Sequence, residues 1–203
     1  MPESVQHLEH YDNGQLKESS LLKGGKPDGE VVSYAETGVM MQQAYFKEGE
    51  LDGETTIYDE QGLVAQKVNL KHGQLDGQMI IYAEGKAQAS MTYKDGKQDG
   101  EALTYDEDEN LIHRAQYKLG KLNGLSKWYD ANGALIKQAQ FRDGKLEGVT
   151  IEYYPNGKIL KASQYKANKL HGEVVTYSPE GKVTERAFYK EGKPAPFPLL
   201  PQR

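Results

Sequence analysis

The side chains that could carry out catalysis or bind a metal are scattered along this chain of 203 residues. There is no cysteine, which excludes a thiolate nucleophile and a cysteine zinc site. His7 and His10 have a spacing that lets two histidines on a helix share a metal, but no third ligand lies nearby. His72, His113 and His171 belong to different segments, whereas nucleophilic catalysis needs a base held beside the nucleophile. We therefore expect no catalytic residue, no cofactor and no metal site.

A run of four carboxylates could bind a cation or a partner protein. Its members are Asp106, Glu107, Asp108 and Glu109. The run lacks the alternating ligands and the glycine of a calcium loop. Two interpretations remain: a solvated hairpin tip, or a loop that contacts a partner.

Trp128 is the only tryptophan of the chain, and basic and imidazole side chains stand near it. Tryptophan and arginine are enriched at the centres of protein interfaces. On a strand, Trp128 would point away from the face of its neighbour Tyr129, towards a face that a single-layer sheet leaves largely uncovered. The alternative is local packing on Leu125 or on a neighbouring strand. Under the interface interpretation the accompanying contacts are Lys127, His113 and Arg114.

These residues are carried by a repeat, which a recurrent glycine reveals. Consecutive copies of this glycine are separated by 23 or 24 residues, at Gly29, Gly53, Gly77, Gly100, Gly124, Gly148 and Gly172. Such a fixed period indicates a repeat array. From fragments such as "GELDG" (49–53), we expect this glycine to end a turn. A tyrosine follows each copy five residues later, and a second glycine-containing turn such as "DEQG" (59–62) follows the tyrosine.

Each repeat therefore reads as a β-hairpin, with aromatic, aliphatic and small side chains alternating onto one face. We expect an all-β fold: an elongated array of about eight antiparallel hairpins that forms one twisted, curved sheet. Residues 1–193 form a single repeat domain. The proline-rich tail 194–203 is either an arm over the last hairpin or a flexible end.

Composition limits the function classes. Apolar residues make up 37% of the chain and its mean hydropathy is −0.77, which is too little apolar material for a compact two-layer core. The 14 tyrosines and the regular repeat argue against disorder. The net charge of −5 gives no global attraction to nucleic acid. A lysine column interleaved with acids is either a phosphate-binding ridge or a solubilising turn rim. No targeting or transmembrane segment is visible, which leaves a cytoplasmic location, or a periplasmic one after removal of a leader.

Three segments carry a family resemblance: "GETTIYDEQG" (53–62), "GVTIEYYPNGKILKASQYK" (148–166) and "GEVVTYSPEGKVTERAFYKEGK" (172–193). They resemble the variant MORN repeat of bacterial proteins of the YwqK-type antitoxin family. The resemblance implies a protein that binds and neutralises a cognate toxin or effector, such as a phospholipase effector of type VI secretion. The chain departs from the repeat at Glu109, which replaces a turn glycine, and at Leu125 and Val149, which replace a recurrent glutamate.

On this resemblance we expect a non-enzymatic immunity protein, with a toxin as partner and a monomer as the favoured state. The expected contacts are Trp128, Lys127, His113, Arg114, Asp106, Glu107, Asp108 and Glu109. The alternative is a membrane-associated, lipid-binding MORN scaffold, which the lysine column favours and the net negative charge disfavours. A third class, an enzyme, lacks any nucleophile–base arrangement in the sequence.

Overall fold

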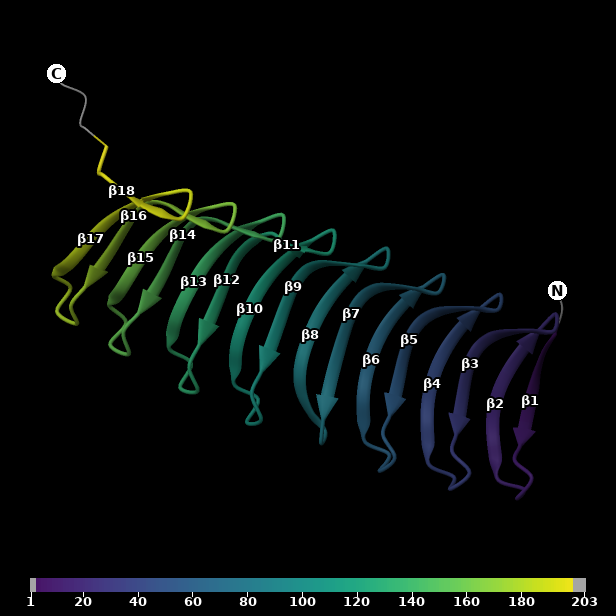
Figure 1. Cartoon of the computed structure of the whole chain (residues 1–203). Coiled ribbons are helices and arrows are strands. Elements are labelled where there is room, and N and C mark those ends of the chain that lie inside the picture. Colours follow the sequence, from purple (N-terminus) through teal and green to yellow (C-terminus); the bar gives the residue numbers. More distant parts are fainter. Residues whose placement is uncertain (1–2, 199–203) are drawn as a thin grey trace. The chain divides into compact units, whose positions relative to one another are not determined.

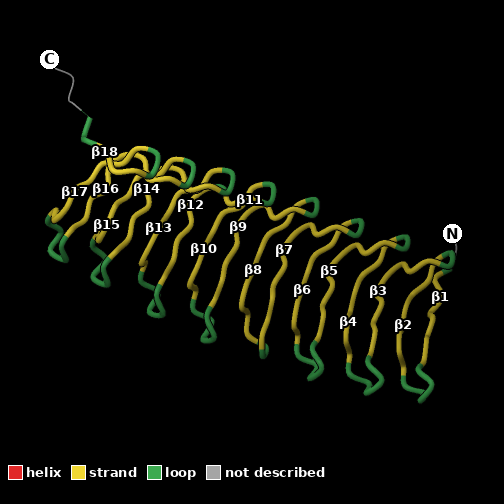
Figure 2. The backbone as a smooth tube through the Cα atoms, viewed as in Figure 1, coloured by secondary structure: helices red, strands yellow, loops and turns green. Residues whose placement is uncertain are grey.

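A computed structural model describes residues 3–198, and all regular structure in this part of the chain is β. Eighteen antiparallel strands form an open sheet of hairpins, which confirms the predicted fold class (Figures 1 and 2). By its internal contacts the chain divides into two units, Met1–Gly100 and Glu101–Arg203, and each is described by itself.

The first unit contains the strands β1 (Ser4–His10), β2 (Leu16–Lys23), β3 (Lys26–Tyr34), β4 (Met40–Lys47), β5 (Glu50–Tyr58), β6 (Val64–Lys71), β7 (Gln74–Ala83) and β8 (Lys86–Lys94). Strand β9 (Lys97–Tyr105) contains the boundary between the units. The second unit contains β10 (Leu111–Lys118), β11 (Lys121–Leu122), β12 (Gly124–Tyr129), β13 (Leu135–Arg142), β14 (Lys145–Tyr153), β15 (Ile159–Lys166), β16 (Lys169–Tyr177), β17 (Val183–Lys190) and β18 (Lys193–Ala195).

Within each unit, a strand mainly contacts the strands that precede and follow it in the chain (Figure 1). The pairing is antiparallel throughout, as in Thr55 opposite Val68 and Ser126 opposite Ala139. Each unit is therefore a single layer, and every strand depends on its two neighbours for packing.

Two kinds of turn alternate along the chain. In the tight turns two central residues both have positive φ, as in Glu48 at 53° and Gly49 at 89°, which is the type I′ geometry that joins twisted antiparallel strands. In the wide turns a glycine follows a type I turn, and Gly62 donates its N–H to the Asp59 carbonyl at 2.9 Å. The second turn of each repeat is thus as predicted. The repeat that is one residue shorter has a tight turn at Glu84 and Gly85 instead.

The recurrent glycine does not end a turn, so that prediction was wrong. Gly53 lies inside β5, where the register shifts between Ala44 and Phe46 of β4. It has φ 131°, and a Cβ atom there would lie 2.9 Å from the Cβ of Tyr45. The residue must be glycine because a β-bulge brings its backbone against the neighbouring strand.

Small side chains form the thin core of each unit. In the first unit Ser20, Ala44, Thr55 and Val68 are buried, and in the second Ala115, Ser126, Ala139, Thr150, Ser163 and Val174. Aromatic residues lie next to them on the same face. Phe141, for example, is two positions beyond Ala139 on β13. A single layer buries small residues fully because larger neighbours on the same face cover them.

Hydrogen bonds also join six of the tight turns to the tight turn before them. Within the units the donors are backbone N–H groups of the turns, and the carbonyl acceptors belong to Pro27, Leu51, Leu75, Leu122, Leu146 and Leu170, at 2.8–3.0 Å. Carboxylates add to this: Asp28 accepts from the N–H of Glu48 at 3.2 Å, and Glu147 from that of Ala167 at 2.9 Å. These members of the acidic column therefore fix the turns in addition to balancing the lysines.

The start of the C-terminal tail pairs with the last long strand. Pro194 lies opposite Tyr189, and the rings of Phe197 and Phe188 have centroids 5.9 Å apart. Residues 193–198 thus form the predicted arm, and the predicted boundary at residue 193 falls at the start of β18. Residues 199–203 lie outside the described part of the chain.

Replacing a bulge glycine should destabilise the fold more than replacing a turn glycine. In Gly77→Ala the new Cβ would lie 2.9 Å from the Cβ of Asn69 at a φ of 118°, whereas Gly73, at 73°, has open space around it. We expect Gly77→Ala to lower the free energy of unfolding by about 2–4 kcal/mol, and Gly73→Ala by about 1 kcal/mol. Urea titration followed by circular dichroism measures both. Equal losses would contradict the bulge explanation.

Candidate functional site

The predicted contact residues of β10 and β12 lie on two different faces of the second unit. His113 is directly opposite Trp128, and Arg114 is directly opposite Lys127. Because side chains alternate along a strand, His113 and Trp128 occupy one face and Arg114 and Lys127 the other. We call these the Trp128 face and the Arg114 face. The structure therefore brings the four residues together as two pairs and not as one surface.

On the Trp128 face, three side chains from three strands pack together. The rings of His113 and Trp128 are stacked, with centroids 4.7 Å apart and an interplanar angle of 21°. Lys137 of β13 places its Nζ atom 5.3 Å from the centroid of the Trp128 ring, within cation–π range. Trp128 is consequently half-buried, and it packs on neighbouring strands and not on Leu125, which points to the other face.

The expectation that Trp128 points towards a largely uncovered face was wrong. Trp128 is opposite Lys137, and Lys137 alternates onto the same face as Ala139 and Phe141. Ser126 and Ala139 are buried on this face, so Trp128 lies on the covered face of the sheet and not on the open one.

Burial sets the protonation of His113. It lowers the pKa of the imidazole below its usual value, so the ring is neutral at pH 7. Within the described residues, the buried Nε2 atom of His113 and the buried Oγ atom of Ser126 have no hydrogen-bond partner. His113 is therefore an uncharged aromatic ring that stacks on Trp128.

Acid should destabilise the fold through His113. Because its pKa is lowered from 6.5, its contribution is complete above that pH and is lost as the pH falls through the folded-state pKa. The variant His113→Phe keeps a stacked ring but cannot be protonated. We therefore expect its free energy of unfolding to fall less between pH 7.5 and 4.5 than that of the wild type. Urea unfolding followed by Trp128 fluorescence at each pH measures this, and carboxylates shared by both proteins cancel in the difference. Identical pH dependence in the two proteins would contradict it.

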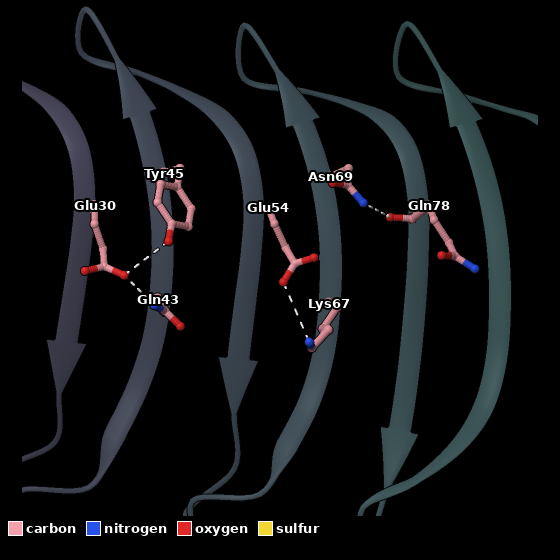
Figure 3. A network of polar contacts seen from close by, with 7 residues as sticks. All are labelled: Glu30, Gln43, Tyr45, Glu54, Lys67, Asn69 and Gln78. Carbon is pink, nitrogen blue, oxygen red and sulfur yellow. Dashed lines mark hydrogen bonds and ion pairs between the residues drawn. The ribbon is translucent and has the colours of Figure 1, made fainter.

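On the Arg114 face, the recurrent glutamate makes cross-strand polar contacts. Glu101 Oε1 lies 3.3 Å from Arg114 Nε, and Glu173 Oε1 lies 3.0 Å from Arg186 Nη1. The equivalent residues of the first unit behave alike: Glu30 accepts from Gln43 and Tyr45, and Glu54 pairs with Lys67 at 3.6 Å (Figure 3). The acid therefore links strands in these four repeats.

Leu125 and Val149 stand where two repeats of the second unit lose this acid. They are 36% and 43% exposed, and lie opposite Gln140 and Gln164. Both point to the Arg114 face, and Leu125 is two positions from Lys127 on the same strand. The replacement of the recurrent glutamate is visible in the sequence. Its importance appears only in the structure, where the glutamates of the other repeats make ion pairs or hydrogen bonds across strands.

The acidic run forms the wide turn between β9 and β10. Asp106 Oδ1 accepts from the N–H groups of Asn110 at 2.8 Å and Asp108 at 3.0 Å, and these donors hold the pKa of the carboxyl below its usual value. Glu109 has φ 64° where the other wide turns have glycine. Glu107, Asp108 and Glu109 are exposed. No group of three or more potential metal ligands occurs in residues 3–198, including the segment around His7 and His10.

A hollow of about 510 Å³ lies between this turn and the next wide turn. Residues 109–111 line one side of it and 131–133 the other, together with Arg114 and Tyr129. The hollow thus joins the acidic turn to the Arg114 face.

The tight turns carry charges of both signs. His72 Nδ1 lies 3.4 Å from Glu50 and 3.8 Å from Asp52, and Lys169 lies 3.9 Å from Glu191. Lysines and acids also share a shallow depression lined by Lys23, Lys26, Asp28 and Glu48. This mixture of signs fits the solubilising rim better than a ridge for phosphates.

Comparison with protein families identifies the repeat. The model described as "MORN repeat variant" matches residues 27–48, 98–119, 122–143, 146–167 and 170–191, more than half of the chain. The chain belongs to the MORN repeat variant family. A matched segment of this MORN protein such as 146–167 comprises β14 except for its first residue, a wide turn and β15. The match confirms the variant MORN repeat that the sequence predicted.

Other comparisons add little to the family match. No curated protein matches the chain. One similar solved structure is a mutant of S. aureus TarM in complex with Fondaparinux, alpha-GlcNAc-glycerol and UDP (12% identity, TM-score 0.30, 71% of this chain and 21% of that chain). Another is the Photorhabdus luminescens Tc holotoxin pore with a mutation in TccC3 (14%, 0.27, 93% and 12%). The MORN protein thus spans a small part of either chain.

Among the described residues, no helix has the length and apolar character needed to cross a bilayer.

Proposed function

We propose that this MORN protein is a non-enzymatic binding protein that holds a partner protein on the Arg114 face of its second unit. The observation that carries the proposal is the pair of exposed apolar residues, Leu125 and Val149, at positions where other repeats have a bonded glutamate. Repeats that keep the glutamate form the same hairpins, so the scaffold does not require the change.

The surroundings of this pair have the composition of an interface. Interfaces place apolar side chains at the centre and polar ones at the rim, with arginine enriched. Here Arg114 and Lys127 share the face of Leu125, and the turn 106–109 borders Arg114 through the hollow. Arg114 is about half exposed although it pairs with Glu101. Lys127, Arg114 and the acidic turn therefore remain proposed contacts.

Trp128 and His113 have a different part in this proposal. Their stack joins β10 to β12, the strand that follows the interruption at Asn123. We assign them the role of holding the opposite face in place, so that Arg114 and Lys127 are presented in a fixed register.

The finer proposal is an immunity or antitoxin function, in which the partner is a bacterial toxin or effector that binding neutralises. Its support is the resemblance of segments such as 172–193 to repeats of the YwqK-type antitoxins. A partner held across the sheet would be blocked sterically, which requires no catalytic group on this chain. A phospholipase effector of type VI secretion is one partner of this class.

Restoring the repeat pattern should abolish binding without harming the fold. The variant Leu125→Glu/Val149→Glu places the recurrent acid back on the Arg114 face. The control is Ile57→Glu, which adds an acid at a site of similar exposure (37%) and copies Glu152 of the equivalent column. Each tagged protein is used to capture proteins from the source organism, and the captured protein is purified for titration calorimetry.

We expect one protein to be recovered near 1:1 by the wild type and the control. The double variant should bind it at least about 30-fold more weakly, which corresponds to roughly 2 kcal/mol. Full affinity of the folded double variant would refute the proposed surface. Capture of vesicles of anionic lipid in place of a protein would support the lipid-binding alternative.

The immunity function needs a separate measurement. The captured protein is expressed in a bacterial host, and growth is followed with and without the MORN protein. We expect growth inhibition that the wild type and Ile57→Glu relieve and the double variant does not. A partner that binds but does not inhibit growth would contradict the antitoxin role and leave the binding role intact.

A further inference from the structure

Other pairs of consecutive wide turns have a site equivalent to the hollow beside the acidic turn. The side chains that occupy those sites show which kind of group fits the hollow. The wide turns that begin at Tyr11, Asp106 and Tyr154 share one backbone pattern, in which the first residue donates its N–H to the carbonyl four residues later. These three positions are therefore equivalent. The residues that end the strand before the next wide turn, Tyr34, Tyr129 and Tyr177, are equivalent in the same way.

In two of these repeats a tyrosine side chain spans the gap between consecutive wide turns. The Tyr11 hydroxyl donates to the Tyr34 carbonyl at 2.8 Å, and the Tyr154 hydroxyl donates to the Tyr177 carbonyl at 2.8 Å. Both tyrosines are half-buried. The site between wide turns is thus one that the chain itself fills with a phenol.

An asparagine makes a second bond across the same gap. Asn13 Nδ2 donates to the Glu36 carbonyl at 3.3 Å, and Asn156 Nδ2 to the Pro179 carbonyl at 3.1 Å. Consecutive wide turns are therefore joined by two donors, a phenol and an amide, in these repeats.

At the acidic turn both donors are replaced by carboxylates. Asp106 is too short to span the gap, and its carboxylate accepts from its own turn, at Asp108 and Asn110. Asp108 occupies the asparagine position, and an ionised carboxylate cannot donate. The space that a tyrosine fills elsewhere is here the hollow lined by Tyr129 and Arg114.

We infer that this hollow is a pocket for a tyrosine side chain of the partner protein, whose hydroxyl donates to the Tyr129 carbonyl. Arg114 lines the pocket, and its guanidinium would supply a cation for the face of the ring, as Lys17 does for Tyr11 at 6.0 Å. A tyrosine is also a common anchor residue at protein interfaces.

The pocket adjoins the surface of the proposed function, on which this inference rests. Arg114 belongs both to the pocket lining and to the face that carries Lys127 and Leu125. A partner that covers the exposed apolar pair could therefore insert a tyrosine between the two wide turns. The inference specifies the chemistry of one partner residue and leaves the rest of the partner open.

The test needs no partner protein. N-acetyl-tyrosine amide and N-acetyl-phenylalanine amide are titrated into the isotope-labelled full chain, and amide shifts are followed by NMR. We expect saturable shifts for the tyrosine probe confined to residues 109–111 and 129–133. The phenylalanine probe, which lacks the hydroxyl, should bind about tenfold more weakly. No shifts, shifts elsewhere, or equal binding of both probes would overturn the inference.

A variant that fills the pocket from within provides the specific control. Asp106→Tyr/Asp108→Asn recreates the tyrosine and asparagine of the turns at 11 and 154. This variant should bind N-acetyl-tyrosine amide at least about tenfold more weakly than the wild type does. The matched variant Asp59→Tyr/Gln61→Asn makes the same change in a wide turn of the first unit, where Asp59 caps its turn in the same way, and should bind like the wild type. Probe binding that survives in the filled variant would refute the pocket.

The same variants separate this inference from the proposed function. If the captured partner binds through Leu125 and Val149 but the tyrosine probe does not bind, the pocket is wrong and the binding function stands. If the probe binds and no partner is captured, the pocket stands without the function.

Discussion

The hydrogen bond that joins a tight turn to the preceding one is the constraint on which the rest of the structure depends. It joins positions about one repeat apart, such as Gly49 and Pro27, and it recurs in both units. A single-layer sheet has no second layer to fix its register, so strand pairing and these turn contacts must do so. At Gly53 and Gly77 the backbone approaches the neighbouring strand too closely for a Cβ, which explains why the bulges there need glycine.

Features that follow from the length of the repeat could be predicted from the sequence. Features that depend on a local shift in strand register could not. The hairpins, the wide turns and the aromatic ladder follow from spacing alone. Gly53 was interpreted as a turn residue because glycine permits positive φ in turns and bulges alike. Trp128 was expected on the open face because the prediction placed Tyr129 on the covered face, and the register shift opposite these residues is not visible in the residue types. Leu125 and Val149 were visible as exceptions, but only the ion pairs of Glu101 and Glu173 show what those exceptions remove.

A repeat of this kind separates stability from recognition. The small buried residues and the turn bonds recur in each unit, so they maintain the hairpins whatever lies on the opposite face. Changes at exposed positions then cost little stability and can be adapted to a partner. In the second unit such changes converge on one region: the acidic turn, the hollow beside it, and the apolar pair on the face of Arg114.

The strain at Glu109 supports the same division of roles. A side chain at a φ of 64° costs roughly 1 kcal/mol relative to glycine, which occupies this position in the other wide turns. The turn closes with the same backbone bonds as its equivalents, so closure does not require a glutamate at this position. Its carboxylate instead adds negative charge to the rim of a hollow that has Arg114 in its lining. Charges of both signs at one rim favour a partner segment of complementary pattern, since electrostatic complementarity contributes more to specificity than to affinity.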